Sequence, residues 1–135
     1  MSSAGYSGTP LIRKLGIKEG FRCRGIKAPE HFEELIGPLP EGARWIAGRR
    51  EMDYVHVFAT NQRELRDGTT KAKSWIHKQG TVWVSWPKGK SSIASEINRE
   101  DVREVGLQSG LVDVKVAALD EDWSGLKFVY RLKDR

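Results

Sequence analysis

The sequence predicts an α/β protein: a three-layer sandwich with a mainly parallel sheet and a C-terminal antiparallel hairpin. Strand-like runs alternate with amphipathic helical segments between residues 21 and 110, an order typical of parallel sheets. Two further strand-like runs, joined by a turn-rich stretch, predict the hairpin. With 39% hydrophobic and 30% charged residues among 135, the chain can bury one core, so we expect a single domain over residues 1–135.

The first segments predict an arm, a short helix and a strand. Residues 1–8 are small and polar, which favours a loose N-terminal arm. Thr9-Pro10 predicts a helix start, with threonine as the N-cap and proline in the first helical position, and Gly16 predicts the end of that helix. Residues 21–26 alternate in polarity and predict the first strand.

A second helix and two more strands come next. Ala28-Pro29-Glu30 predicts a helix start, because proline suits the first turn and an acid is favourable at the positive end of the helix dipole. Gly37-Pro38 predicts where this helix ends. Residues 44–47 predict a short strand, and residues 53–59 predict a longer one.

The third helix is predicted from its cap. Asn61, followed three residues later by Glu64, resembles a capping box. We expect Asp67-Gly68 to kink or interrupt this helix and Gln79-Gly80 to close it. The β-type run 81–86 then predicts a strand.

The C-terminal part predicts a helix and the hairpin. Pro87 should end the preceding strand, since proline has no amide to donate to the sheet. Asn98 and Asp101 predict the cap of a last helix that ends near Gly110. The hairpin strands are expected at about 112–119 and 126–132.

Charge and cysteine content exclude several protein classes. The net charge is +5, and the densest basic stretch runs from Arg13 to Lys27; it is either a solvated surface or an anion-binding face. The single Cys23 excludes an internal disulfide and a Cys-based zinc cluster. No apolar run reaches the ~20 residues that span a bilayer, and the N-terminus lacks the order of a signal peptide. We therefore expect a cytoplasmic protein with no membrane partner.

Seven runs, spread over nearly the whole chain, carry a family resemblance: Gly5–Leu11, Lys14–Lys18, Ala28–Glu30, Trp83–Lys88, Val102–Leu107, Gly110–Val116 and Trp123–Val129. They are similar to a small bacterial family, the domain of unknown function numbered three thousand and fifty-two. The resemblance implies a shortened Rossmann-like fold of the class I S-adenosylmethionine methyltransferase type. It implies no established reaction.

The sequence departs from the pattern of residues expected to bind such a cofactor. A methyltransferase of this class needs a glycine-rich turn after the first strand and an acid at the end of the second. Here the turn Gly25-Ile26-Lys27-Ala28-Pro29 has one glycine and a proline without an amide, and Gly48-Arg49-Arg50-Glu51 places the acid beside two cations. We expect no cofactor, and S-adenosylmethionine binding is kept as the alternative.

The histidines form no metal-binding or catalytic pattern. His56 lies within an alternating strand and is expected to pack there, and His77 is expected at a helix end. His31 is better placed for function, in the first turn of the helix after the first strand. Cys23 is expected to be buried and inert. The sequence thus predicts no catalytic residue and no metal site.

Two groups of residues predict surfaces for a partner. Trp83 and Trp86 should face opposite sides of one strand, and Trp86, beside the cationic loop 88–92, is the candidate for stacking on a planar ligand. Gly89-Lys90-Ser91 lacks the upstream glycine of a phosphate-binding loop. Arg22 and Arg24 lie on one face of the first strand, which indicates an incompletely covered sheet and hence a homodimer to test.

The leading hypothesis is a non-catalytic binding or regulatory module for an anionic or planar small molecule or a protein partner. The alternatives are a divergent S-adenosylmethionine-dependent methyltransferase relative and a weak nucleic-acid binder. Lys88 and Lys90 should be exposed, so replacing both with alanine should change stability by no more than about 0.5 kcal/mol and weaken an anionic ligand. The candidate ligand-binding residues, at the carboxyl ends of the parallel strands, are Pro29, Glu30, His31, Thr60, Asn61, Trp86, Lys88, Lys90 and Ser91.

Overall fold

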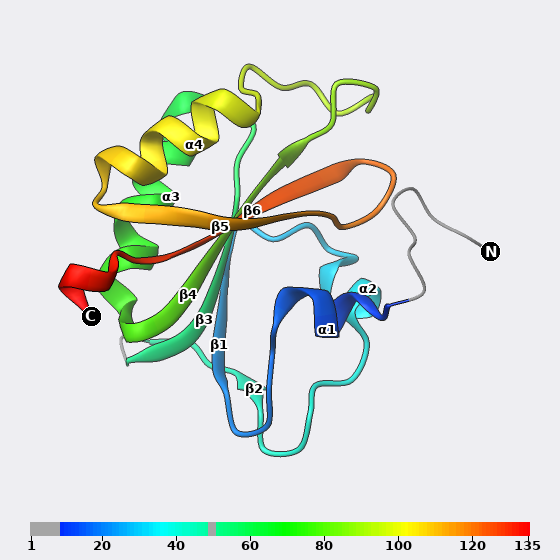
Figure 1. The fold of residues 1–135 in the computed structure, drawn as a ribbon. Coiled ribbons are helices and arrows are strands. Elements are labelled where there is room, and N and C mark those ends of the chain that lie inside the picture. Colours follow the sequence, from blue (N-terminus) through cyan, green and yellow to red (C-terminus); the bar gives the residue numbers. More distant parts are fainter. Residues whose placement is uncertain (1–8, 49–50) are drawn as a thin grey trace.

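The computed structural model describes residues 9–48 and 51–135, which form a six-stranded sheet with helices on both faces (Figure 1). The predicted arm 1–8 lies outside the described residues. The elements in chain order are α1 (Leu11–Leu15), β1 (Arg22–Ile26), α2 (Phe32–Ile36), β2 (Arg44–Trp45), β3 (Met52–Phe58), α3 (Gln62–Trp75), β4 (Ile76–Pro87), α4 (Arg99–Gln108), β5 (Leu111–Ala118), β6 (Trp123–Tyr130) and the 3-10 helix η1 (Leu132–Asp134).

The sheet is mixed, with strand order β2-β1-β3-β4-β6-β5. The pairings β1–β2, β1–β3 and β3–β4 are parallel, whereas β4–β6 and β5–β6 are antiparallel. The predicted α/β architecture is confirmed. The predicted parallel sheet is confirmed for the β2-β1-β3-β4 half, and the C-terminal hairpin supplies the antiparallel half by placing β6 between β4 and β5.

Apolar side chains form one core on each face of the sheet. On the α3 and α4 side, Leu65 and Val102 pack with Val57 and Val84. On the opposite side, α1 and α2 contribute to a second core of Leu15, Ile17, Cys23, Phe32, Ile36, Tyr54, Phe58, Trp83, Leu119 and Trp123. The prediction that Trp83 and Trp86 face opposite sides of one strand is confirmed, because the two rings belong to different cores.

The short α1 ends where the sequence predicts. Gly16 adopts φ 80°, a left-handed conformation that suits glycine, and its N–H donates to the carbonyls of Ile12 and Arg13. The predicted cap is wrong by one residue: the N-cap is Pro10 and no side chain caps the helix, so Thr9 does not act as the cap.

The predicted kink in α3 is wrong. The helix runs unbroken from Gln62 to Trp75, and Gly68 is buried on it. A Cβ on Gly68 would lie 2.5 Å from Cγ1 of Val57, so glycine is present because the helix approaches β3 closely. The predicted close at Gln79-Gly80 is also wrong, because β4 begins at Ile76.

The C-terminal elements match the prediction closely. Asn98 and Asp101 cap α4 reciprocally: each side chain accepts a hydrogen bond from the other residue's backbone N–H, at 3.1 and 2.9 Å. The helix ends at Gln108, two residues before Gly110. Strand β6 starts at Trp123 rather than 126, because this part of the predicted turn pairs with Pro87 and Trp86 of β4.

Candidate functional site

A cleft of about 500 Å³ opens at the carboxyl ends of β1 and β2. Trp45 and Phe32 form its aromatic wall, with ring centroids 5.7 Å apart. Phe32 is fixed from behind by edge-to-face contacts with His56 and Phe58, at 4.9 and 4.8 Å. We call this the β1–β2 cleft; its lining residues are Arg24, Gly25, Ala28, Pro29, Glu30, Phe32, Glu33, Trp45, Ile46 and Ala47.

The positive and negative side chains of the β1–β2 cleft differ in their contacts within the chain. The Arg24 guanidinium lies 3.8 Å above the ring of Trp75, a residue outside the cleft, and donates to the carbonyl of Gly48 at 2.6 Å, so it is engaged within the chain. Glu30 and Glu33 are exposed, and neither carboxylate has an ion-pair partner among residues 9–48 and 51–135. The cleft therefore favours ligands that carry hydrogen-bond donors or positive charge.

The turn after β1 limits what can approach the backbone. Lys27 has φ 57°, a left-handed conformation uncommon for a residue other than glycine. A Cβ on Gly25 would contact the Ala28 side chain at 3.4 Å, so this turn is tight. Pro29 offers no amide hydrogen to a ligand.

The sequence-predicted site residues line three different depressions. Pro29 and Glu30 line the β1–β2 cleft. Asn61 lines a second one, of about 410 Å³, with Lys27 and Gly68. A third, of about 320 Å³, is lined by Trp86, Lys88 and Ser91.

Trp86 lines the third depression but exposes little surface for stacking. Its exposed fraction is 6%, and it belongs to the core beneath α4. The sequence prediction missed this because it took the end of β4 as a place where side chains leave the core. Lys90 is exposed as predicted, whereas Lys88 is half-buried. Ser91 is engaged, since its hydroxyl donates to Asp122 at 2.8 Å and accepts from the backbone N–H of Ile93.

Thr60 and Asn61 are used to begin α3. The Asn61 side chain accepts from the backbone N–H of Glu64 at 2.9 Å and caps the helix. Glu64 in turn accepts from the backbone N–H and the hydroxyl of Thr60, at 2.9 and 3.1 Å. Their polar groups thus already have partners within the chain.

His31 forms an exposed pair with Asp120. Its Nε2 lies 2.9 Å from Oδ2 of Asp120, which connects the start of α2 to the turn between β5 and β6. Burial alone would raise the pKa of Asp120, but hydrogen bonds from His31 and from the backbone of Trp123 and Asp122 lower it. The carboxylate orients this imidazole, yet His31 does not line the β1–β2 cleft.

His56 packs within its strand, as predicted, and has two buried partners. Its Nδ1 is 2.7 Å from the Tyr54 hydroxyl and its Nε2 is 2.7 Å from the Ser85 hydroxyl. Burial lowers the pKa of His56 to about 3 and raises that of Tyr54 well above its ordinary value. Ser85, His56 and Tyr54 are all inaccessible to solvent, so this chain of hydrogen bonds cannot act on an external substrate.

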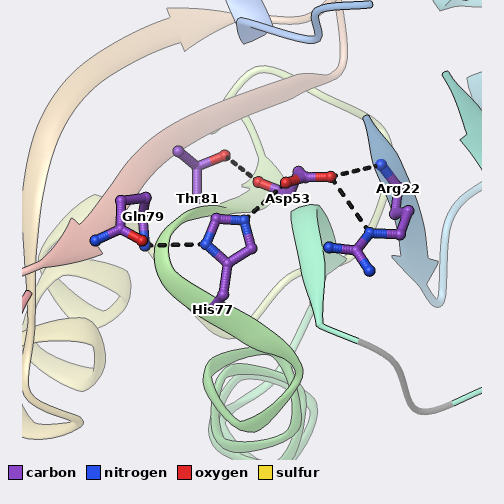
Figure 2. A network of polar contacts seen from close by, with 5 residues as sticks. All are labelled: Arg22, Asp53, His77, Gln79 and Thr81. Carbon is purple, nitrogen blue, oxygen red and sulfur yellow. Dashed lines mark hydrogen bonds and ion pairs between the residues drawn. The ribbon is translucent and has the colours of Figure 1, made fainter. Parts of the chain in front are cut away.

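His77 is not at a helix end, because it lies on β4 and contacts Asp53 of β3 (Figure 2). Its Nδ1 accepts from the backbone N–H of Gln79 at 3.1 Å, so Nε2 carries the proton and donates to Asp53 at 2.7 Å. Asp53 also accepts from the backbone N–H of Arg22 at 2.8 Å, and its own backbone carbonyl lies 3.4 Å from the Thr81 hydroxyl. With both ring nitrogens engaged, His77 is structural.

The arginines of β1 have identifiable partners. Arg22 lies 3.6 Å from Asp53, and Arg24 stacks on Trp75 at the end of α3. Both side chains are half-buried, so contacts within the chain account for them. The homodimer inferred from an uncovered face stays a prediction.

Other candidate chemistry is limited within the described ranges. Cys23 is buried, and burial together with nearby Asp53 raises the pKa of its thiol to about 12, so the thiol is inert as predicted. Residues 9–48 and 51–135 hold no cluster of three or more metal-ligating side chains. In the same part of the chain, no helix has the length and hydropathy required to cross a membrane.

Sequence reasoning missed the aromatic wall of the β1–β2 cleft. The short strand 44–47 was predicted, but Trp45 within it was not considered as a ligand contact. The available signal was a tryptophan in a predicted strand of only four residues; in the structure β2 is shorter still, Arg44–Trp45, and Trp45 is half-buried.

Solved structures show which fold this chain shares. It is similar to fibrillarin from Aeropyrum pernix, solved in complex with natively bound S-adenosyl-L-methionine (TM-score 0.57, 14% identity, 93% of this chain and 70% of that one). It is also similar to a SAM dependent methyltransferase from Aquifex aeolicus (TM-score 0.63, 8% identity, 87% and 86%). The N-methyltransferase NodS from Bradyrhizobium japonicum is a third (TM-score 0.58, 12% identity, 87% and 90%).

These structural similarities establish a methyltransferase-like Rossmann fold. At identities this low they establish nothing about activity. Among curated proteins, none matches the sequence. A family model matches residues 49–132, which is more than half of the chain. The chain therefore belongs to the family described as protein of unknown function DUF3052.

Proposed function

We propose that this chain is a non-catalytic binding module whose β1–β2 cleft takes a planar, non-acidic small molecule. The observation that carries the proposal is the cleft itself: about 500 Å³ of space at the carboxyl ends of β1 and β2, walled by Trp45, Phe32 and Ile46. In open α/β sheets this edge is where ligands usually bind.

The cleft chemistry supports a planar ligand with donors. An aromatic ring can stack on Trp45, which Phe32 holds in place. Glu30 and Glu33 can accept hydrogen bonds from hydroxyl or amino groups, while they repel phosphate and carboxylate. The anionic ligand considered from the sequence is therefore disfavoured here, and Lys88 and Lys90 are not among the cleft residues.

The residues do not fit S-adenosylmethionine as enzymes of this fold class are expected to hold it. Lys27 occupies a left-handed position in the turn after β1, where the motif calls for glycine, and Pro29 removes an amide. On the β2 side the described lining of the cleft ends in Ile46 and Ala47, with no carboxylate there for ribose hydroxyls. We therefore derive no methyl-transfer step.

A divergent methyltransferase relative is the second candidate. It is favoured by the fold, since fibrillarin is solved with natively bound S-adenosyl-L-methionine and other neighbours are methyltransferases. Glu30 and Glu33 would then contact the ribose from the α2 side.

The experiment is a calorimetric titration with adenosine, its acidic counterpart adenosine monophosphate, and S-adenosylmethionine. We expect saturable adenosine binding, weaker binding of the monophosphate, and a loss of at least about tenfold in adenosine affinity for Trp45→Ala, because the stacking surface is removed. Glu30→Gln/Glu33→Gln should abolish the discrimination against the monophosphate.

Lys88→Ala/Lys90→Ala is the matched control, because it removes two charges in the loop after β4, and neither lysine lines the β1–β2 cleft. It should bind adenosine like the parent protein. Absence of saturable binding, or binding that Trp45→Ala leaves unchanged, would overturn the proposal. Much tighter binding of S-adenosylmethionine than of adenosine, with S-adenosylhomocysteine formed when a methyl-accepting substrate is added, would instead establish the methyltransferase candidate.

A further inference from the structure

Two lysines of the C-terminal hairpin lie beside the end of α1, and the charge of a third lysine, Lys18, acts on one of them. Lys115 of β5 and Lys127 of β6 are direct cross-strand partners. The Lys115 ammonium donates to the carbonyl of Lys14 at 2.8 Å, across 101 sequence positions, and Lys127 Nζ lies 3.4 Å from where a Cβ on Gly16 would be. Lys18 follows Gly16 by two residues. These three side chains form what we call the α1 lysine cluster.

The positive charges of this cluster have no ion-pair partner within the described ranges, residues 9–48 and 51–135. Like charges directly opposite each other on neighbouring strands are destabilising. Lys127 is half-buried, and burial together with the charges of Lys115 and Lys18 lowers its pKa.

Attraction to the carbonyl end of α1 does not account for three ammonium groups. The carbonyls of Ile12 and Arg13 accept from the backbone N–H groups of Gly16 and Ile17. The carbonyl of Leu15 accepts from the Trp83 indole at 2.9 Å, and that of Lys14 accepts from Lys115. All four carbonyls already accept hydrogen bonds, so the helix end leaves most of this charge without a partner.

We propose that Lys18, Lys115 and Lys127 form a binding site for a compact phosphate-type oxyanion. The ammonium groups of Lys115 and Lys127 lie beside Lys14 and Gly16 at the end of α1, which suits a single highly charged group more than an extended nucleic-acid backbone. The cluster lies beside α1 and shares no residue with the β1–β2 cleft, so the inference does not depend on the proposed function.

The test is a titration with tripolyphosphate at constant ionic strength, followed by calorimetry and by the melting temperature. We expect saturable binding and a raised melting temperature for the parent protein. Lys115→Met/Lys127→Met, which keeps the apolar stems, should weaken binding by at least about tenfold, since each charge-assisted hydrogen bond is worth about that factor. Lys88→Met/Lys90→Met removes the same charge elsewhere and should bind as the parent does.

A second measurement does not depend on adding an anion. Because Lys115 and Lys127 repel each other, Lys127→Met alone should melt at a temperature equal to or higher than the parent protein in chloride. Equal tripolyphosphate affinity for the cluster variant and the Lys88/Lys90 control would overturn the proposal. A markedly lower melting temperature for Lys127→Met, or a labelled oligonucleotide that binds more tightly than tripolyphosphate at equal phosphate concentration, would also overturn it.

Discussion

At the scale of single residues, His56 shows how burial sets a charge state. The imidazole is inaccessible to solvent, stacks on Phe58 with centroids 4.4 Å apart, and is hydrogen-bonded at both nitrogens. With its pKa lowered to about 3 by burial, His56 is neutral in the folded protein across the physiological range. One nitrogen therefore donates and the other accepts, which fits two hydroxyl partners.

This neutrality predicts a pH dependence of stability. Below pH 6.5 the unfolded chain binds a proton at His56 that the folded chain cannot bind until about pH 3, so stability falls as the pH falls through that window. Between pH 7 and 5 the free energy of unfolding should fall by about 2 kcal/mol more for the parent than for His56→Gln. Urea denaturation at each pH measures the difference. Identical slopes for the two proteins would contradict the assignment.

Gly106 is required by packing rather than by backbone conformation. A Cβ at this position would lie 2.1 Å from Cε1 of Phe128, whose ring is completely buried. We expect Gly106→Ala to lower the free energy of unfolding by about 1–3 kcal/mol, because α4 must move away from β6. Gly89→Ala is the control, since its Cβ would meet nothing within 4 Å. Chemical denaturation that shows equal stability for both variants would argue against this close contact.

At the scale of elements, the caps explain where helices begin. In α4 the reciprocal hydrogen bonds of Asn98 and Asp101 satisfy two backbone N–H groups. Asn98→Ala should cost about 1 kcal/mol of stability, whereas Asn98→Asp should cost much less because the carboxylate also accepts from N3. Thermal and urea unfolding of the two variants distinguish capping from a general effect of position 98; an equal loss in both would contradict the capping role.

The element boundaries show what local sequence can and cannot determine. Caps and strand alternation predicted β1, β3 and α4 because their signals are short-range. The boundary at Trp75 could not be predicted, because residues 76–80 form a strand only through pairing of Ile76 with Met52 of β3. The role of Gly68 depends on Val57, a contact that sequence alone does not reveal.

The candidate site predicted from the sequence overlaps the β1–β2 cleft only in part. The sequence placed it at the carboxyl ends of the parallel strands, on residues 28–31, 60–61 and 86–92, and of its candidate residues Pro29 and Glu30 line the cleft. The cleft's aromatic wall depends on Phe32 packing against Trp45, and the burial of Trp86 depends on the core under α4. Both are tertiary contacts, so residue type and spacing did not identify them.

At the scale of the whole molecule, one sheet connects two separate cores. The strands carry side chains of both, as with Val57 and Phe58, neighbours in β3 that belong to different cores. The parallel strands β1, β3 and β4 are joined by long crossover connections and not by tight turns. At the amino-terminal ends of these strands, contacts between side chains and backbone of neighbouring strands must therefore hold the sheet together. The Asp53 network is at that edge, with contacts to Arg22 of β1 and His77 of β4 (Figure 2).

Asp53 should therefore matter to the stability of the whole domain. Burial alone would raise its pKa, but hydrogen bonds from the Arg22 backbone and from His77, together with the positive charge of Arg22, lower it below 3.8. A carboxyl group with a lowered pKa stabilises the fold at pH values above its pKa in the unfolded chain, and this stabilisation is lost as the pH falls through its pKa in the folded protein.

Asp53→Asn should cost about 2 kcal/mol of stability at pH 7, because two strands lose a charged acceptor, and the difference from the parent should shrink below pH 3.8. Asp113→Asn is the matched control: it removes an ion pair, 3.3 Å from Arg103, on edge strand β5 and should cost less than about 1 kcal/mol. Urea unfolding of both variants and the parent at pH 7 and pH 3 measures these stability losses. Equal losses for Asp53→Asn and Asp113→Asn would mean that Asp53 contributes no more to the stability of the sheet than an ordinary surface charge does.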